Sequence, residues 1–182
     1  KIGNFLRSRY DCILSTSKTI NYDNPLLNCR IESLEQKSPT VAIVDRSFKI
    51  KKSLKLFKDK TRDIFIFTQI NDIVKEKYFK KIGINIIKLK KSNNLKDDVA
   101  EVYLLLKKLG FNRILLESGI KYINEVLKNN LIKNFYLFKS SFRLKNNGKN
   151  NSKIDLIRKL KTTINNKVKI NLNGDSLYKI QL

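Results

Sequence analysis

Four short apolar runs, separated by helical or polar segments, constrain the fold of this chain more than any other feature. The runs are TVAIVD (40–45), DIFIFT (63–68), INIIKL (84–89) and RILLE (113–117). They are apolar at successive positions, which is typical of strands covered on both faces. Strands that alternate with helices usually form a parallel sheet, so we expect an α/β fold.

The remaining pattern predicts further elements around this sheet. Helical spacing predicts helices over 1–9, 71–82, 95–110 and 118–130, and two more apolar runs predict strands over 10–14 and 134–140. We expect Asp97 to cap the helix at 95–110. That helix should bury Val99, Val102, Leu106 and Leu109. The helix at 118–130 should point Ile120, Ile123 and Leu127 inward.

The end of the chain reads differently from the middle. The segments 167–172 and 176–182 alternate in polarity around Asn173-Gly174-Asp175, which predicts an antiparallel hairpin. A polar loop is expected at 143–153. With 182 residues and 41% hydrophobic content, we expect a single domain over 1–182.

Residue usage excludes some chemistry. The chain has no histidine, and Cys12 and Cys29 are isolated from each other in the sequence. A zinc site and histidine-based catalysis are therefore not expected, and we predict no metal. No apolar run reaches the length of a membrane span and no secretory signal opens the chain, which favours a reduced cytoplasmic protein.

The formal net charge of +23 raises the question of a nucleic-acid partner. The lysines are scattered, and no basic stretch is interleaved with aromatic residues as in a stacking platform. The excess of lysine, asparagine and isoleucine also fits an AT-rich coding bias. We therefore expect no specific nucleic-acid partner.

The segment KTINYDNPLLNCR (18–30) is the first candidate site, because it follows the predicted strand at 10–14. Pro25 stiffens the backbone after Asp23, and Arg30 could pair with Asp23 or with a ligand phosphate. The simpler interpretation is a plain turn in which Asp23 caps nearby amides. Both interpretations stay open on these residues alone.

The segment LLESGIKY (115–122) is the second candidate site. Glu117 ends a predicted strand, and Ser118-Gly119 opens a predicted helix. The first turn of a helix presents unpaired N–H groups that suit a phosphate, whereas the carboxylate would accept bonds from hydroxyl or amide donors. An ordinary strand-to-helix turn would look similar.

Together these segments carry a family resemblance. FLRSRYDCILSTSKTINYDNPLLNCR, AIVDRSFKI, ILLESGIKYINEVLKNNLIKNFYLF and GDSLYKIQL occur in that order. The chain resembles the reductase domain of the bacterial riboflavin-biosynthesis deaminase/reductase, whose fold is similar to dihydrofolate reductase. The most specific part is T-x-x-x-D-N-P-x-L-x-x-R, supported by the E-x-G turn.

The resemblance implies NADPH-dependent reduction of 5-amino-6-(5-phosphoribosylamino)uracil, which opens the ribose to a ribityl chain. We expect Asp23 to act in catalysis by orienting the open-chain imine and its protons. The resemblance implies substrate contacts from Arg7, Leu27, Arg30 and Glu117. It implies cofactor contacts from Thr19, Asp23, Arg46, Gly119, Ile120, Lys121, Tyr122, Ile123, Asn124 and Glu125.

The same resemblance sets expectations about the rest of the protein. A homodimer is implied, and so is a first strand of the form K-x-A-x-S-x-D-G, which these 182 residues do not contain. We therefore expect an N-terminally incomplete reductase domain with no deaminase domain in this chain. The alternatives are the related reductase that acts on the 2,5-diamino precursor, and a non-catalytic reductase-like or basic nucleic-acid-binding domain.

Overall fold

The computed structural model describes residues 2–92, 94–142, 167–170 and 172–182 of the chain. It divides into two compact units, Lys1–Ile123 and Asn124–Leu182. Within the described ranges, no helix combines the length and the apolarity that crossing a membrane requires. The prediction of one N-terminally incomplete reductase domain stays a prediction.

The first unit contains the alternating part of the chain. Its strands are β1 (Cys12–Thr16), β2 (Thr40–Val44), β3 (Ile64–Thr68), β4 (Asn85–Lys88) and β5 (Ile114–Leu116). Its helices are α1 (Ile2–Arg7), α2 (Ser17–Asp23), α3 (Ile73–Lys81) and α4 (Leu95–Lys108), with short 3-10 turns at Glu35–Lys37 and Lys55–Lys58. Helix α5 (Ile120–Lys128) begins in the first unit and ends in the second.

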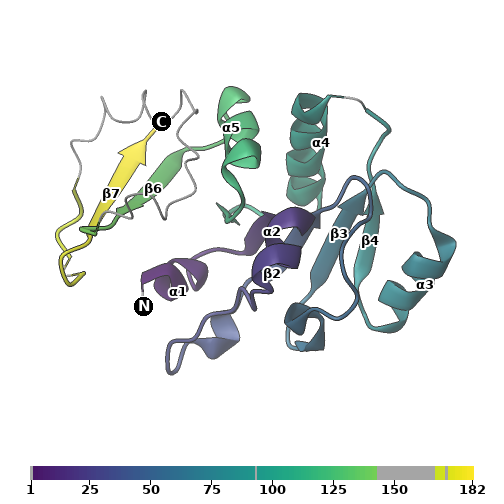
Figure 1. Cartoon of the computed structure of the whole chain (residues 1–182), viewed down its shortest axis with the longest axis horizontal. Coiled ribbons are helices and arrows are strands. Elements are labelled where there is room, and N and C mark those ends of the chain that lie inside the picture. Colours follow the sequence, from purple (N-terminus) through teal and green to yellow (C-terminus); the bar gives the residue numbers. More distant parts are fainter. Residues whose placement is uncertain (1, 93, 143–166, 171) are drawn as a thin grey trace. The chain divides into compact units, whose positions relative to one another are not determined.

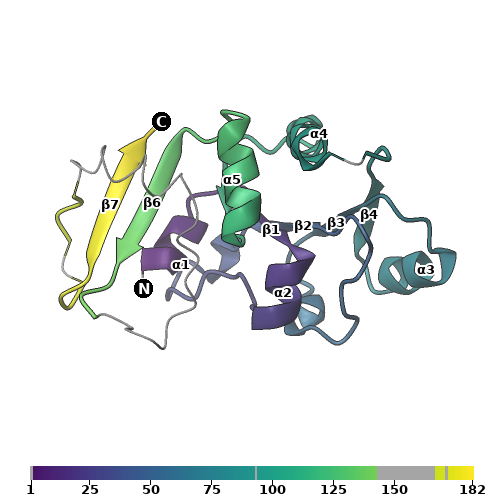
Figure 2. The same cartoon turned by 45° about the horizontal axis from the view of Figure 1, so that its top comes forward.

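All five strands form one parallel sheet in the order β4-β3-β2-β1-β5. In Figure 2, which shows β1 to β4 side by side, α4 covers one face of the sheet and α2 the other. Because the strands are parallel, their carboxyl ends lie at one edge, where ligands bind in sheets of this kind. The predicted α/β class with a mostly parallel sheet is confirmed.

The core explains why these runs are continuously apolar. Alternate residues of β1 to β3, such as Ile13, Val41 and Ile66, pack in one cluster with Ile20 of α2 and Phe79 of α3. The apolar side chains on both sides of the central strands β1 to β3 are therefore mostly buried, as expected where helices cover both faces of a parallel sheet.

On α4, Val99, Val102 and Leu106 are fully buried as predicted, whereas Leu109 is 43% exposed. Leu109 lies past the last helical residue, so the predicted buried face was one residue too long. The cap is also different from the prediction, because Asn94 rather than Asp97 accepts the backbone N–H of Lys96 (2.9 Å). The asparagine precedes the helix, where capping side chains act, while Asp97 lies in the first turn.

Helix α5 differs from its predicted orientation. Tyr122 and Val126 are its buried residues, and Ile120, Ile123 and Leu127 are only partly buried. Tyr122 and Val126 are four positions apart, so they lie on the same face of the helix. The pattern of aliphatic residues alone did not indicate this face.

The second unit contains an antiparallel pair, β6 (Asn134–Lys139) with β7 (Ser176–Gln181). The predicted turn at Asn173-Gly174 is present, with positive φ angles of 52° and 94°. The segment before the turn meets β7 through the Lys167–Tyr178 bridge. The predicted antiparallel hairpin is confirmed, although β7 makes its long ladder with β6. The loop expected at 143–153 lies outside the described residues.

Candidate functional site

The carboxyl end of β1 meets the turn after β5 through Thr19. Thr16 ends β1 and caps α2, because its hydroxyl accepts the N–H of Thr19. The Thr19 hydroxyl in turn accepts the backbone N–H of Gly119 (3.1 Å). The two candidate segments, a hundred residues apart in sequence, are therefore adjacent in the structure (Figure 1).

The sequence interpretation treated residues 18–30 as a loop, but the first part of this segment is helical. Residues Ser17–Asp23 form α2, although threonine and asparagine are weak helix formers. The cap at Thr16 and the complete burial of Ile20 against the sheet stabilise this helix. Tertiary packing has overridden the local preference.

Arg7 and Glu117 form a two-pronged ion pair at this edge. Arg7 Nε and Nη2 donate to the two carboxylate oxygens at 2.9 and 2.8 Å. The Arg7 side chain is only 16% exposed, and its Nη1 also donates to the carbonyl of Asn28 at 3.1 Å. The bond to Glu117 raises the pKa of Arg7 above its usual value. Two predicted substrate residues are thus brought together with the backbone of the 24–30 loop.

The 24–30 loop follows α2 and is held in an unusual conformation. Asn24 and Leu27 have positive φ angles of 45° and 53°. A leucine in this region costs roughly 1–2 kcal/mol, so neighbouring contacts must hold it. The Asn24 side chain accepts the N–H of Lys55 (2.9 Å), and the N–H of Cys29 donates to the Ser38 hydroxyl (3.0 Å).

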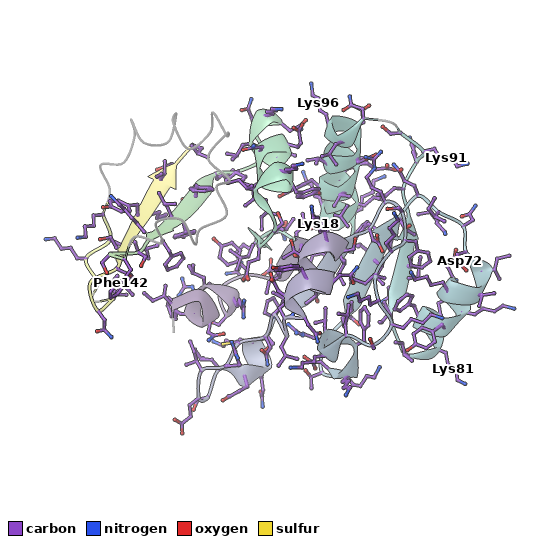
Figure 3. All side chains as sticks on the ribbon, in the orientation of Figure 1. Lys18, Asp72, Lys81, Lys91, Lys96 and Phe142 are labelled. Atoms are coloured by element: carbon purple, nitrogen blue, oxygen red, sulfur yellow. The ribbon has the colours of Figure 1, made fainter. Side chains whose placement is uncertain are left out.

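Asp23 and Arg30 lie at the two ends of this loop. Asp23 is the exposed last residue of α2, four residues after Thr19 and so on the same helix face. Arg30 is exposed as well, and the structure forms no Asp23–Arg30 pair. Lys18, exposed in the first turn of α2 (Figure 3), adds a positive charge next to Thr19. The exposed side chains of Lys18 and Arg30 are therefore available to an anionic ligand. Leu27 is buried, with 4% exposed.

Arg46, a predicted cofactor residue, contacts protein groups. Its Nε pairs with Asp98 of α4 at 2.5 Å, and its Nη2 donates to the carbonyl of Ser92 at 2.6 Å. Burial raises the pKa of Asp98, and the charge of Arg46 and a bond from Gln69 oppose that shift. Arg46 thereby ties the end of β2 to the start of α4.

The start of α5 fits the phosphates of a dinucleotide. The N–H groups of Ile120 and Lys121 have no partner within the helix, as in the first turn of any helix. A Cβ added at Gly119 would contact only the Thr19 hydroxyl, at 3.8 Å, so the approach to this turn is open. The Tyr122 hydroxyl is buried without a protein partner among the described residues, and burial raises its pKa.

The other predicted cofactor residues of this segment lie farther along α5. Ile123 is partly buried in α5. Asn124 and Glu125 belong to the second unit, where Glu125 pairs with Lys128 (2.8 Å). Ser118 has no positive φ, so the turn does not need a glycine at that position.

Sequence interpretation missed two residues with buried side chains that hold the segments around the site. Asp45, 1% exposed, accepts the Ser17 hydroxyl (2.8 Å) and the N–H groups of Lys49 and Ile50 (2.9 and 2.6 Å). An acid directly after a buried strand was the available signal, as for Glu117. Arg62 donates to carbonyls of the 24–30 loop, and no sequence pattern marked it.

In the described part of the chain, potential metal ligands do not cluster and both thiols are buried. The described residues include no group of three or more carboxylate or thiol side chains that could hold a metal ion. Cys12 and Cys29 are both buried and free. Burial raises the pKa of Cys12 to about 12, so its thiol stays protonated.

With this geometry described, comparison with known proteins identifies the family. The family model described as the RibD C-terminal domain matches residues 2–144. The chain belongs to the RibD C-terminal domain family. The riboflavin biosynthesis protein RibD of Buchnera aphidicola subsp. Baizongia pistaciae (strain Bp) is 26% identical over 146 residues. That match covers 73% of this chain and 38% of the relative.

Solved structures with the RibD fold match almost the whole chain. RibD of Acinetobacter baumannii (form 1) has a TM-score of 0.72 at 14% identity, covering 98% of this chain and 48% of that one. A deaminase/5-amino-6-(5-phosphoribosylamino)uracil reductase of Thermotoga maritima has a TM-score of 0.67 at 15% identity, covering 98% and 47%. A pyrimidine reductase-like protein of Corynebacterium diphtheriae has a TM-score of 0.69 at 12% identity, covering 98% and 78%.

These likenesses confirm the predicted dihydrofolate-reductase-like fold. At identities this low they concern the fold alone. This chain spans less than two fifths of the length of the curated relative and about half of the length of the first two solved chains.

Proposed function

We propose that this chain reduces 5-amino-6-(5-phosphoribosylamino)uracil with NADPH to the ribitylamino product of riboflavin biosynthesis. Family membership supports an oxidoreductase of this pathway. The observation that carries the proposal is the junction of the two candidate segments. Glu117 binds Arg7, Arg7 binds the 24–30 loop, and Gly119 binds Thr19.

The residues present fit both ligands. The open first turn of α5, together with Thr19 and Lys18, would hold the phosphates and nicotinamide side of the cofactor. Arg30 presents an exposed guanidinium that suits a 5-phosphate. Glu117 has lone pairs beyond those that Arg7 uses, and they can accept bonds from the ribose hydroxyls or the pyrimidine amino groups.

The chemistry that NADPH would supply, if bound here, is a hydride for C1 of the open-chain ribose imine, whose nitrogen would gain a proton. Asp23, on the same face of α2 as Thr19, would orient the imine and hold that proton. The chain's part is to hold the two partners in contact and to exclude water. No protein nucleophile is required.

The test is NADPH oxidation by the purified chain with the deaminated pyrimidine substrate, and separately with its 2,5-diamino precursor. Faster turnover of the deaminated substrate supports the proposal, and faster turnover of the precursor assigns the related reductase. Asp23→Asn should lower kcat about 100-fold or more, as loss of a general acid–base group does. Asp63→Asn, an exposed acid before β3, removes the same charge elsewhere and should leave kcat unchanged.

The remaining expectations about the protein belong with this proposal. The homodimer, which the family likeness implies, and the cytoplasmic location expected from the sequence both remain proposals. Sedimentation of the purified chain would measure its oligomeric state.

A further inference from the structure

We propose that Arg62, outside the segments of the family resemblance, is the positioning residue that holds the substrate loop at 24–30. This inference rests on the proposed function, because Leu27 and Arg30 of that loop are its substrate candidates. Arg62 lies just before β3, 32 or more positions after the loop in sequence. No ligand contact is assigned to it, so it would act through the loop.

The guanidinium of Arg62 is almost fully engaged in hydrogen bonds, and two of them go to carbonyls of this loop. Its Nη1 donates to the carbonyl of Leu27 at 2.7 Å and to that of Pro39 at 3.1 Å. Its Nη2 donates to the carbonyl of Leu26. Its Nε donates to Asp59 at 2.9 Å. These bonds use four of the five N–H groups that an arginine possesses.

Burial and charge show that Arg62 is not an ordinary surface residue. Its side chain is 4% exposed, and Asp59, which pairs with it, is 17% exposed. Burial lowers the pKa of Arg62, and the charge of Asp59 opposes that shift. Asp59 is itself fixed by the hydroxyl (2.7 Å) and N–H (3.0 Å) of Thr61. The carbonyls of the loop are therefore bound by a group with its own fixed support.

The bonds fall on the part of the loop that most needs them. Leu27 carries one of the two positive φ angles of the loop, and its carbonyl and that of the preceding residue are the two loop carbonyls that Arg62 binds. Arg7 binds the next carbonyl, that of Asn28. Two arginines thus hold three successive carbonyls and place the chain that leads to Arg30. Without Arg62, the strained backbone is expected to relax and Arg30 to lose its fixed position.

Lysine cannot replace this arrangement. Its three N–H groups radiate from one atom, whereas the planar guanidinium reaches a carboxylate on one side and carbonyls on the other. Arg62→Lys keeps the charge beside Asp59 and loses most of the loop bonds. Arg113→Lys is the matched control, because Arg113 pairs with Asp11 (2.8 Å) and binds no residue of the loop.

The first measurement is steady-state kinetics with the full chain. Arg62→Lys should raise the KM for the pyrimidine phosphate about tenfold, with kcat and the KM for NADPH within about twofold of wild type. Arg113→Lys should leave kcat and both KM values unchanged. An unchanged pyrimidine KM in Arg62→Lys, or an equal rise in both variants, would overturn the proposal.

A second variant covers the case in which a buried lysine disturbs folding. Arg62 lines a cavity of about 290 Å³ with Phe57, Lys60 and Ile84. In a variant without the arginine, a small cation can enter this cavity and occupy the position of the guanidinium. In Arg62→Ala, millimolar guanidinium should restore part of the substrate KM, whereas urea at the same concentration should not. Failure of guanidinium to lower the KM contradicts a positioning role.

Hydrogen exchange separates this inference from the proposed function. Amides of residues 26–30 should exchange faster in Arg62→Lys than in wild type, with those of β1 and β2 unchanged. A wild-type chain without reductase activity would overturn the proposed function, and the exchange result would still decide whether Arg62 holds the loop. Unchanged exchange at 26–30 would overturn the inference whatever the activity.

Discussion

Two arginine–carboxylate pairs in the first unit resemble each other in geometry and differ in what they leave free. Asp11 and Arg113 join the amino ends of β1 and β5 at 2.8 Å, and Glu117, at the carboxyl end of β5, binds Arg7 at the same distance. The Arg113 side chain is 65% exposed, whereas Arg7 is 16% exposed.

The two carboxylates differ in saturation. Asp11 accepts the backbone N–H groups of Asn112 and Arg113 (3.3 and 2.9 Å) as well as two bonds from the Arg113 side chain. Among the residues that the structure describes, Glu117 accepts two bonds, both from Arg7. A saturated carboxylate ties strands together, whereas one with unused lone pairs can also bind a ligand. We therefore propose a structural role for the Asp11–Arg113 pair and a binding role for Glu117.

The largest expected effect comes from removing each carboxylate charge in turn. Glu117→Gln should lower kcat/KM for the pyrimidine about 100-fold, since a hydrogen bond to a charged group contributes about 1.5–3 kcal/mol. Asp11→Asn, the matched change at the opposite edge, should lower it less than twofold. Steady-state kinetics on both variants measure this. Equal losses in the two variants would remove the distinction between the ends.

A smaller effect is expected where a neutral bond joins the two segments. Thr19→Val keeps the shape of the side chain and removes the hydroxyl that accepts the Gly119 N–H. The dissociation constant of NADPH should rise about fivefold, since one neutral hydrogen bond contributes about 1 kcal/mol. Thr19→Ser keeps the hydroxyl and should bind like wild type in a fluorescence titration. A normal affinity in Thr19→Val would place the cofactor elsewhere.

The smallest effect concerns the pH dependence of stability at the amino end. Burial opposes ionisation of Asp11, but the bonds from Arg113 and Asn112 outweigh it and hold its pKa below the usual value. A lowered folded-state pKa contributes stability above the unfolded value of about 3.9 and loses it as the pH falls through the folded pKa.

Asp11→Asn should therefore lower the free energy of unfolding at pH 7 by about 0.5 kcal/mol, a typical contribution of a solvent-exposed pair. The difference from wild type should shrink as the pH falls below about 3.9 and through the lowered folded-state pKa. Urea unfolding at a series of pH values measures it. A difference that grows on acidification would reverse the assigned sign.

The sequence predicted the parallel sheet well for a physical reason. Runs such as TVAIVD and DIFIFT are continuously apolar because helices cover both faces, as the burial of Val41, Ala42 and Ile43 shows. Local composition carries that information directly. The turn at Asn173-Gly174 was predictable for a similar reason, because its residue types tolerate positive φ.

The features that sequence missed depend on distant contacts. Helix α2 forms because Thr16 caps it and Ile20 is buried, although its residues favour other structures. Arg62 reaches residues 35 and 36 positions away, and no spacing rule links such positions. Glu117 and Thr19 were predictable as candidates from strand ends and family likeness. Their bonds to Arg7 and Gly119 required coordinates.

The most direct test of the reductase assignment follows the hydride itself. The chain is incubated with the pyrimidine phosphate and NADPH that carries deuterium at both C4 positions of the nicotinamide, and the product is analysed by mass spectrometry and NMR. The account predicts one deuterium at C1 of the new ribityl chain for each NADPH consumed. A folded chain that consumes no NADPH with either pyrimidine, or forms a product without deuterium at that carbon, would contradict it.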